Sequence, residues 1–155
     1  MTKRFRIRKM RPEDLDAAMQ ILEEWNMAPV PPSKESPDPE RSSINVQNSF
    51  VAVHGTRIVG VCSYITHSQE LAETASLAVH PDWTGNGIGY RLQCARLEEM
   101  RERGVKKVRT ETDRPETIDW YMTRFDYRKI GRSQKKHAFS LENVHCWTVL
   151  ELDLQ

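Results

Sequence analysis

The chain of 155 residues lacks an excess of charge of either sign, because 23 Lys and Arg residues stand against 22 Asp and Glu residues. With a formal net charge of +1 it has no global field to attract a polyanion, so nucleic acid is disfavoured as a partner. The chain also lacks a run of about 18 apolar residues and an apolar segment behind its charged start, so membrane spanning and secretion have no support. We expect no membrane contact and a cytoplasmic location.

Cysteine is scarce, and the motifs that employ it are missing. Cys62, Cys94 and Cys146 are odd in number and widely spaced in apolar or helical contexts, which favours buried reduced thiols over a disulfide framework. The five histidines show no His-x-x-x-His spacing and the cysteines no Cys-x-x-Cys spacing, so we expect no metal. The chain also has no Gly-x-Ser-x-Gly elbow and no Cys-centred nucleophile signature, which disfavours a covalent enzyme intermediate.

Glycine is scarce as well, yet three of the seven glycines are grouped. Gly85, Gly87 and Gly89 stand at alternate positions between a β-rich run that ends at Val79 and a run with helical character. This spacing lets the backbone turn its N–H groups toward one point, to which the helix adds its positive end. A Walker loop would need Gly-Lys-Ser/Thr, and a dinucleotide fingerprint would need glycine where Tyr90 stands. The segment therefore predicts a diphosphate site of another kind.

The residues around these glycines resemble a known family signature. The segment 77–92 resembles the Arg/Gln-x-x-Gly-x-Gly/Ala motif of the GNAT superfamily of acyl-CoA-dependent N-acetyltransferases, behind a strand that ends Val-x-Pro. Thr84 stands at the Arg/Gln position. The run 115–127 looks like the family's later helix with its Phe-Tyr-x-x-Gly-Phe/Tyr ending, and Asp126 stands at the usual Gly. The resemblance covers nearly the whole chain in the right order, which implies one domain over residues 1–155.

Hydrophobic periodicity and turn signals predict an α/β (α+β) domain with a mixed, mostly antiparallel central sheet flanked by helices, which is also the fold that the resemblance implies. The expected strands are 5–8, 50–53, 57–65, 71–79, 105–112, 128–139 and 145–154. The expected helices are 12–25, 87–103 and 115–127. Between the first helix and the second strand, five of the eight prolines interrupt regular structure over residues 26–43. That segment is either a lid on the acceptor side, as the resemblance implies, or an irregular surface connection.

The resemblance implies that acetyl-CoA binds along the strand end and the glycine loop. The main chain of the strand end would pair with the pantetheine arm, and the N–H of Val79 would face the thioester carbonyl. This strand end consists of Leu77, Ala78 and Val79. The backbone of the glycine loop would bind the pyrophosphate. This loop consists of Thr84, Gly85, Asn86, Gly87, Ile88 and Gly89. Arg91, one helical turn later, either adds positive charge or is a solvated helix position.

Three side chains are candidates for the proton transfers that acetylation of an amine requires. Tyr121 matches the tyrosine of the family's Phe-Tyr pair, which protonates the leaving thiolate, and a free phenol with a pKa near ~10 can donate at neutral pH. The alternative to this acid role is that Tyr121 is a core tyrosine. Glu73 stands where the histone-acetylating branch has its glutamate base, and Glu111 resembles the base of the enzymes that acetylate ribosomal protein N-termini. Either carboxylate could instead be an exposed strand-end charge.

Between the two carboxylates we favour Glu73 from the sequence. An unbroken strand fixes its distance from Val79 and places both residues on one face. The segment between Glu111 and Tyr121 is two residues shorter than the resemblance leads us to expect. The sequence thus predicts Glu73 as the base and leaves Glu111 as the alternative.

The motifs and the resemblance together predict an N-acetyltransferase that moves an acetyl group from acetyl-CoA to a primary amine by direct attack in a ternary complex. The alternative is a non-catalytic acyl-CoA binding or sensing module on the same fold, which the departures at Thr84 and Asp126 keep open. A pure interaction module would not require three glycines beside a helix start. The sequence leaves the amine acceptor, a small molecule or a peptide amine, unspecified. The aromatic-rich closing strand with Trp147 is compatible with a homodimer.

Overall fold

The structure is a computed structural model that describes residues 3–28, 44–135, 140–141 and 143–154. The described strands are β1 (Arg6–Lys9), β2 (Ser49–His54), β3 (Arg57–Thr66), β4 (Leu71–Val79), β5 (Lys107–Thr112), β6 (Arg128–Gln134) and β7 (Cys146–Asp153). The described helices are α1 (Leu15–Glu24), α2 (Ile88–Glu102) and α3 (Pro115–Phe125). The expected elements are present with shifted ends. Most of the proline-rich segment 26–43 and the end of the expected strand 128–139 lie outside the described residues.

The strands form one sheet in the order β1-β2-β3-β4-β5-β7-β6, in which β4 and β5 are the parallel neighbours and the other pairs are antiparallel. This confirms the predicted mixed, mostly antiparallel sheet. The parallel pair follows from the chain path, because α2 carries the chain from the end of β4 back to the start of β5. None of the helices in the described ranges is long and apolar enough to cross a membrane.

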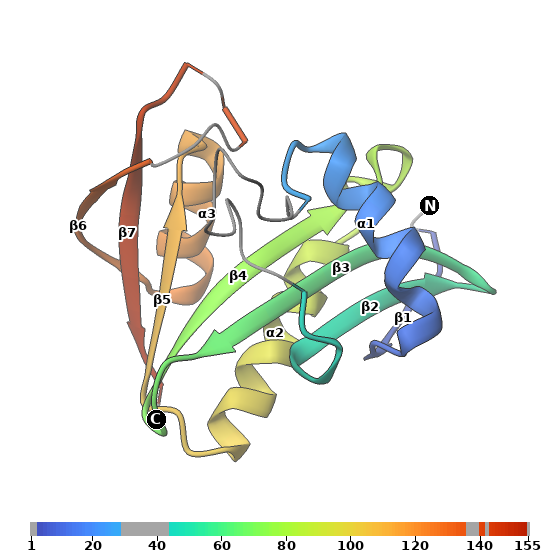
Figure 1. Cartoon of the computed structure of the whole chain (residues 1–155), viewed down its shortest axis with the longest axis horizontal. Helices are drawn as coiled ribbons and strands as arrows, with labels where there is room; N and C mark the ends of the chain where they lie inside the picture. Colours follow the sequence, from blue (N-terminus) through green and yellow to red (C-terminus); the bar gives the residue numbers. More distant parts are fainter. Residues whose placement is uncertain (1–2, 29–43, 136–139, 142, 155) are drawn as a thin grey trace, which may run out of the picture.

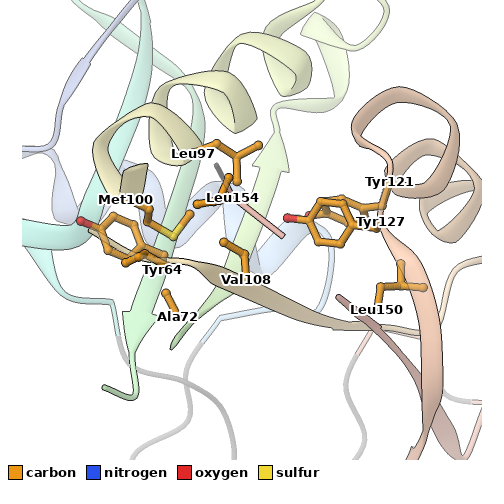
Figure 2. Close-up of a cluster of buried hydrophobic side chains, with 10 residues drawn as sticks. Tyr64, Ala72, Leu97, Met100, Val108, Tyr121, Tyr127, Leu150 and Leu154 are labelled. Carbon is orange, nitrogen blue, oxygen red and sulfur yellow. The ribbon is translucent and has the colours of Figure 1, made fainter. Parts of the chain in front are cut away.

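Helices cover both faces of the sheet (Figure 1). On one face α1 packs on β2, β3 and β4, with Leu22 against Val51 and Val61. On the other face lie α2 and α3. Figure 2 shows the core beneath these two helices, where Leu97 and Met100 of α2 and Tyr121 of α3 meet the sheet. Alternate residues of the central strands thus point to opposite layers, as the strand period requires.

The sheet opens between its two halves because the pairing of β4 with β5 is short. Backbone partners run only from Leu71 with Lys107 to Glu73 with Arg109, and beyond them the two strands diverge (Figure 1). At the point of separation the hydroxyl of Thr110 donates a 3.2 Å hydrogen bond to the carbonyl of Thr74. Farther along β4, none of the described strands pairs with its backbone on the β5 side.

A bulge in β4 lies at the same place. Opposite β3 the register passes from Ser76 to Thr74, so Ala75 is an extra residue on β4. A bulge bends its strand and increases the local twist. The bulge therefore supports the divergence of β4 from β5, and it leaves main-chain carbonyls beside it that need other partners.

Candidate active site

A cavity of about 560 Å³ occupies the opening between β4 and β5. One wall comes from β4, the opposite wall from β5 and the segment behind it, and the remainder from α3, the glycine loop and the end of α1. The residues that line it are Trp25, Met27, Ala75, Leu77, Ala78, Val79, Thr84, Gly85, Gly89, Thr110, Glu111, Thr112, Asp113, Arg114, Glu116, Thr117, Trp120, Tyr121 and Ser140. The cavity thus brings most of the sequence-predicted site residues together.

The glycine loop has the backbone of a phosphate cradle. Gly85 and Gly87 both have φ +81°, in the left-handed region that a side chain disfavours, and Gly87 is the N-cap of α2. A Cβ atom built at Gly85, Gly87 or Gly89 would meet no heavy atom within 4 Å, so the space beside this backbone is open. The first N–H groups of α2 have no partner inside the helix by position. The loop therefore fits a diphosphate at a helix N-terminus.

The end of β4 turns one of its main-chain donors toward the cavity. The N–H of His80 donates a 2.8 Å hydrogen bond to the carbonyl of Val59 on β3. Since successive residues of a strand direct their N–H groups to opposite sides, the N–H of Val79 points away from β3 and toward the opening. The carbonyl of Val79 accepts a 2.8 Å hydrogen bond from the indole of Trp25. No acceptor for the Val79 N–H occurs among the described residues, so it is a donor of the kind that a thioester carbonyl requires.

The structure separates the two candidate carboxylates. Glu111 lines the cavity, whereas Glu73 is not among the described residues that do so. The Glu73 carboxylate lies 3.2 Å from Nε2 of His67. Burial and the negative charge of Glu73 raise the pKa of Glu111 above its usual value. Although the Glu111 residue is exposed at the mouth of the cavity, a carboxyl with a raised pKa holds a proton more readily than an ordinary one and is better suited to accept it. The geometry therefore favours Glu111, in contrast to the preference drawn from the sequence.

Tyr121 lies in the wall of the cavity and is only 3% exposed. Its phenol oxygen accepts a 2.9 Å hydrogen bond from Nη2 of Arg96, and its ring lies 4.9 Å from that of Tyr127. The two tyrosines lie side by side beneath α3 in Figure 2. The sequence left two interpretations of Tyr121, a proton donor or a core tyrosine. The side chain is buried in the core and also lines the cavity, so its position is compatible with both.

Four of the predicted cofactor-binding residues do not line the cavity: Gly87, which is the N-cap of α2, and Asn86, Ile88 and Arg91. Nδ2 of Asn86 donates to the carbonyl of Trp83, at 2.9 Å. Ile88 is 1% exposed and packs in the core beneath α2, so only its backbone faces the loop. The guanidinium of Arg91 lies 4.7 Å from the ring of Phe5. Arg91 is exposed, so this contact with the start of the chain is compatible with a solvated helix position and does not decide between the two alternatives.

Part of the cavity wall has no signal in the sequence. Asp113, 7% exposed, accepts hydrogen bonds from Nζ of Lys135 at 2.5 Å and from the backbone N–H of Leu141 at 2.8 Å. Arg114 donates from Nε to the hydroxyl of Ser140 at 2.9 Å. Each of these contacts joins residues more than 20 positions apart, so no local sequence pattern predicts it. The Asp-Arg-Pro run before α3 does signal the start of a helix. These contacts fix the segment behind β5 to the chain that follows β6.

The two departures from the family motif have separate structural roles. Thr84 donates from its hydroxyl to the carbonyl of Pro81 at 3.2 Å, so its side chain closes the turn before the loop. Asp126 has φ +59° and is the C-cap of α3, in the left-handed conformation that explains glycine at this position. Aspartate tolerates this region better than most residues. The Asp126 departure therefore leaves the backbone path intact.

The family model described as Acetyltransferase (GNAT) family matches residues 15–127, which run from the start of α1 to the residue before β6. The chain belongs to the GNAT acetyltransferase family. The matched span includes the whole glycine loop and both walls of the cavity. The comparison with curated proteins found no match for the sequence. The described residues contain no group of three or more His, Cys, Asp or Glu side chains placed to hold a metal ion.

Solved structures of the family share the fold at low sequence identity. Ard1 from Thermoplasma volcanium aligns with a TM-score of 0.74 and 16% identity, over 97% of this chain and 98% of its own. The ribosomal-protein-S18-alanine N-acetyltransferase from Escherichia coli aligns with a TM-score of 0.72 and 19% identity, over 97% of this chain and 94% of its own. YncA from Salmonella typhimurium, solved with its cofactor acetyl-CoA, aligns with a TM-score of 0.73 and 14% identity, over 99% of this chain and 95% of its own. At these identities the likeness shows the fold alone.

Proposed function

We propose that this chain transfers the acetyl group of acetyl-CoA to a primary amine by direct attack in a ternary complex. One observation carries the proposal: Glu111 of β5 and Tyr121 of α3 line the same cavity as the glycine loop. A proton acceptor, a proton donor and a diphosphate cradle from three separate elements thus meet at one opening. Neighbours solved with acetyl-CoA or CoA support the choice of cosubstrate.

The residues present fit acetyl-CoA, which supplies an activated acetyl thioester when bound. Gly85, Gly87 and Gly89, together with the start of α2, would hold the pyrophosphate through backbone N–H groups. The main chain of β4 would hold the pantetheine arm, and the N–H of Val79 would stabilise the charge that develops on the thioester carbonyl oxygen.

Proton transfer falls to the two side chains that line the cavity. An amine that resembles lysine has a pKa near ~10, so it is protonated at neutral pH and must lose a proton before it attacks. Glu111 would accept this proton directly or through water. Tyr121 would donate its phenol proton to the departing sulfur. We assign Glu73 to the neighbourhood of Glu111, where its charge raises the pKa of that carboxyl.

The proposal is tested by release of free thiol from acetyl-CoA with a panel of amines that includes peptide N-termini, lysine, polyamines and amino acids. We expect release that depends on one class of acceptor and that Glu111→Gln and Tyr121→Phe both diminish. The alternative, a non-catalytic acyl-CoA binding module, is favoured by Thr84 at the Arg/Gln position of the motif. Tight binding of acetyl-CoA without thiol release from any acceptor would establish that alternative.

A further inference from the structure

Arg96 is a fully buried arginine whose partners in the described part of the chain include no carboxylate. Its Nε donates to Oε1 of Gln93 at 2.6 Å, and its Nη1 donates to the carbonyls of Ser63 and Ser76, each at 2.9 Å. Its Nη2 donates to the phenol oxygen of Tyr121 at 2.9 Å. Arginine keeps its charge in proteins, so this is a buried cation held by neutral oxygens alone.

A buried ion without an opposite charge is costly, and an apolar side chain of similar volume would avoid that cost. Arg96 does satisfy the carbonyls of Ser63 and Ser76, which lie on the two strands beside the bulge in β4. Neutral donors would suffice for that purpose. The charge itself therefore needs another explanation, and the partner that remains is the Tyr121 phenol.

The neighbouring titratable groups do not offset the charge at neutral pH. Burial raises the pKa of the Cys62 thiol to about 11 and that of Tyr127 to about 12, so both are neutral. Nε2 of Gln93 donates a 2.9 Å hydrogen bond to the hydroxyl of Tyr127 and thereby completes the cluster on the side of α2. Within the described residues, Arg96 is thus the one charged side chain of this cluster.

We infer that Arg96 is a positioning residue for Tyr121, a conclusion that rests on the proposed acetyl transfer. Guanidinium hydrogens can only donate, so the phenol oxygen must accept from Arg96, and the phenol's own hydrogen stays unused by this contact. Among the described residues, the phenol donates no hydrogen bond to another group. Arg96 therefore leaves the phenol hydrogen for a ligand and places a positive charge beside the oxygen that would lose it.

The charges balance in the step that Arg96 supports. The acceptor nitrogen bonds to the acetyl carbon, the carbon–sulfur bond breaks, and its electron pair goes to sulfur. Sulfur takes the proton of Tyr121, and the electron pair left on the phenolate oxygen lies beside Nη2 of Arg96. Arg96 keeps its proton throughout, and solvent reprotonates the phenolate. Glu111 passes to solvent the proton that the ammonium loses before attack, and the second proton, which the nitrogen loses as the amide forms, leaves by the same route.

A kinetic double-mutant cycle tests this inference. Arg96→Met removes the charge and should lower kcat by roughly tenfold to a hundredfold while the KM for acetyl-CoA changes less than about twofold. In the Tyr121→Phe background the same substitution should cost little further kcat, because the oxygen through which it acts is gone. Arg103→Met is the matched control, an arginine at the C-cap of α2 that pairs with Glu99. Equal losses with and without the Tyr121 hydroxyl would make Arg96 structural and overturn the inference.

A second readout uses the protein without ligand. The ultraviolet absorbance of tyrosinate is followed against pH, and the part that Tyr121→Phe removes is assigned to Tyr121. A nearby cation favours a phenolate, so Arg96→Met should shift this part to higher pH, whereas Arg103→Met should not. The groups that face the phenol and the guanidinium are Tyr127 and Cys62, and both remain in every variant. Absence of a shift would overturn the inference.

Arg96→Lys serves if Arg96→Met does not fold, since it keeps a charge with a compact donor in place of the planar fork. It should lower kcat less than the methionine variant, and the loss should vanish in the Tyr121→Phe background. An equal loss in both backgrounds would overturn the inference. Absence of thiol release with every acceptor would refute the proposed function, and the titration without ligand would still decide the contact between Arg96 and Tyr121.

Discussion

The indole Nε1 of Trp25 donates a 2.8 Å hydrogen bond to the carbonyl oxygen of Val79 and so ties the segment behind α1 to the end of β4. Both residues line the cavity between β4 and β5. The contact engages the carbonyl and leaves the N–H of Val79 directed toward the opening, where an acyl carbonyl would need a donor. A residue 54 positions away thus determines which main-chain group of β4 is available.

Gly87→Val should abolish binding of acetyl-CoA, which we expect in the micromolar range, about 7 to 9 kcal/mol. Gly87 has φ +81°, a conformation that a β-branched residue disfavours, and a side chain there would fill the open space beside the loop. Calorimetry and the rise in Tm with acetyl-CoA measure the effect.

Gly104→Val is the matched control for this cradle variant. Gly104 has φ +87° just beyond the C-terminal end of α2 and likewise meets no atom within 4 Å of an added Cβ. It should suffer similar strain but retain affinity. A folded Gly87→Val protein with normal affinity would contradict the cradle assignment.

Tyr121→Phe should lower kcat by roughly 10² to 10⁴, the usual range for one positioned acid, with little change in affinity for acetyl-CoA. Steady-state rates and calorimetry measure the two effects. Tyr64→Phe is the control, because Tyr64 belongs to the same core but bonds to Glu99 at 2.7 Å. It should reduce stability by about 1 kcal/mol and spare the rate. Unchanged turnover in Tyr121→Phe would assign Tyr121 to packing.

Glu111→Gln should lower the rate at neutral pH and recover part of it as the pH approaches the acceptor's own pKa, where solvent supplies the neutral amine. Profiles of rate against pH with a good acceptor measure this. A raised carboxyl pKa means that the charged form is less favourable in the folded chain, so its contribution to stability is lost as pH rises through the folded pKa. Glu111→Gln should therefore not lower Tm at neutral pH.

Glu73→Gln separates the two carboxylates. Removal of the Glu73 charge should lower the pKa of Glu111, since that charge contributes to its rise after burial. The acidic limb of the rate profile should move to lower pH, with the rate at neutral pH nearly unchanged. The opposite order, a large loss in Glu73→Gln and none in Glu111→Gln, would make Glu73 the base, as the sequence predicted.

Gly60→Ala should destabilise the fold by about 1 to 3 kcal/mol, because the new Cβ would lie 2.8 Å from Cγ2 of Ile88 and 3.1 Å from Cδ1 of Leu92. Denaturant unfolding measures the change. Gly131→Ala in β6 is the control, since no atom lies within 4 Å of its added Cβ, and it should change stability by less than about 0.5 kcal/mol. Equal effects would show that α2 shifts freely over the sheet.

The preference for Glu73 illustrates where sequence reasoning stops. The alternation of β4 predicted Glu73 and Val79 on one face. That prediction is wrong, because the extra residue Ala75 shifts the alternation and places the two on opposite faces of β4. Which carboxylate reaches the cavity depends on the end of backbone pairing at Glu73 and Arg109 and on the bulge at Ala75. Both features arise from contacts between strands, so neither has a signature within β4 itself.

The sequence by itself determined the features that backbone sterics and periodicity govern: the glycine loop with its left-handed residues, the start of α2 behind it, and the order of strands and helices that places the chain in its family. Only the tertiary structure decided which side chains share the cavity. Trp25 reaches Val79, and Arg96 reaches Tyr121 across 25 residues, because α1, α2 and α3 pack on the sheet at particular places. Local conformation follows from neighbouring residues, whereas these partners follow from the packing of a whole core.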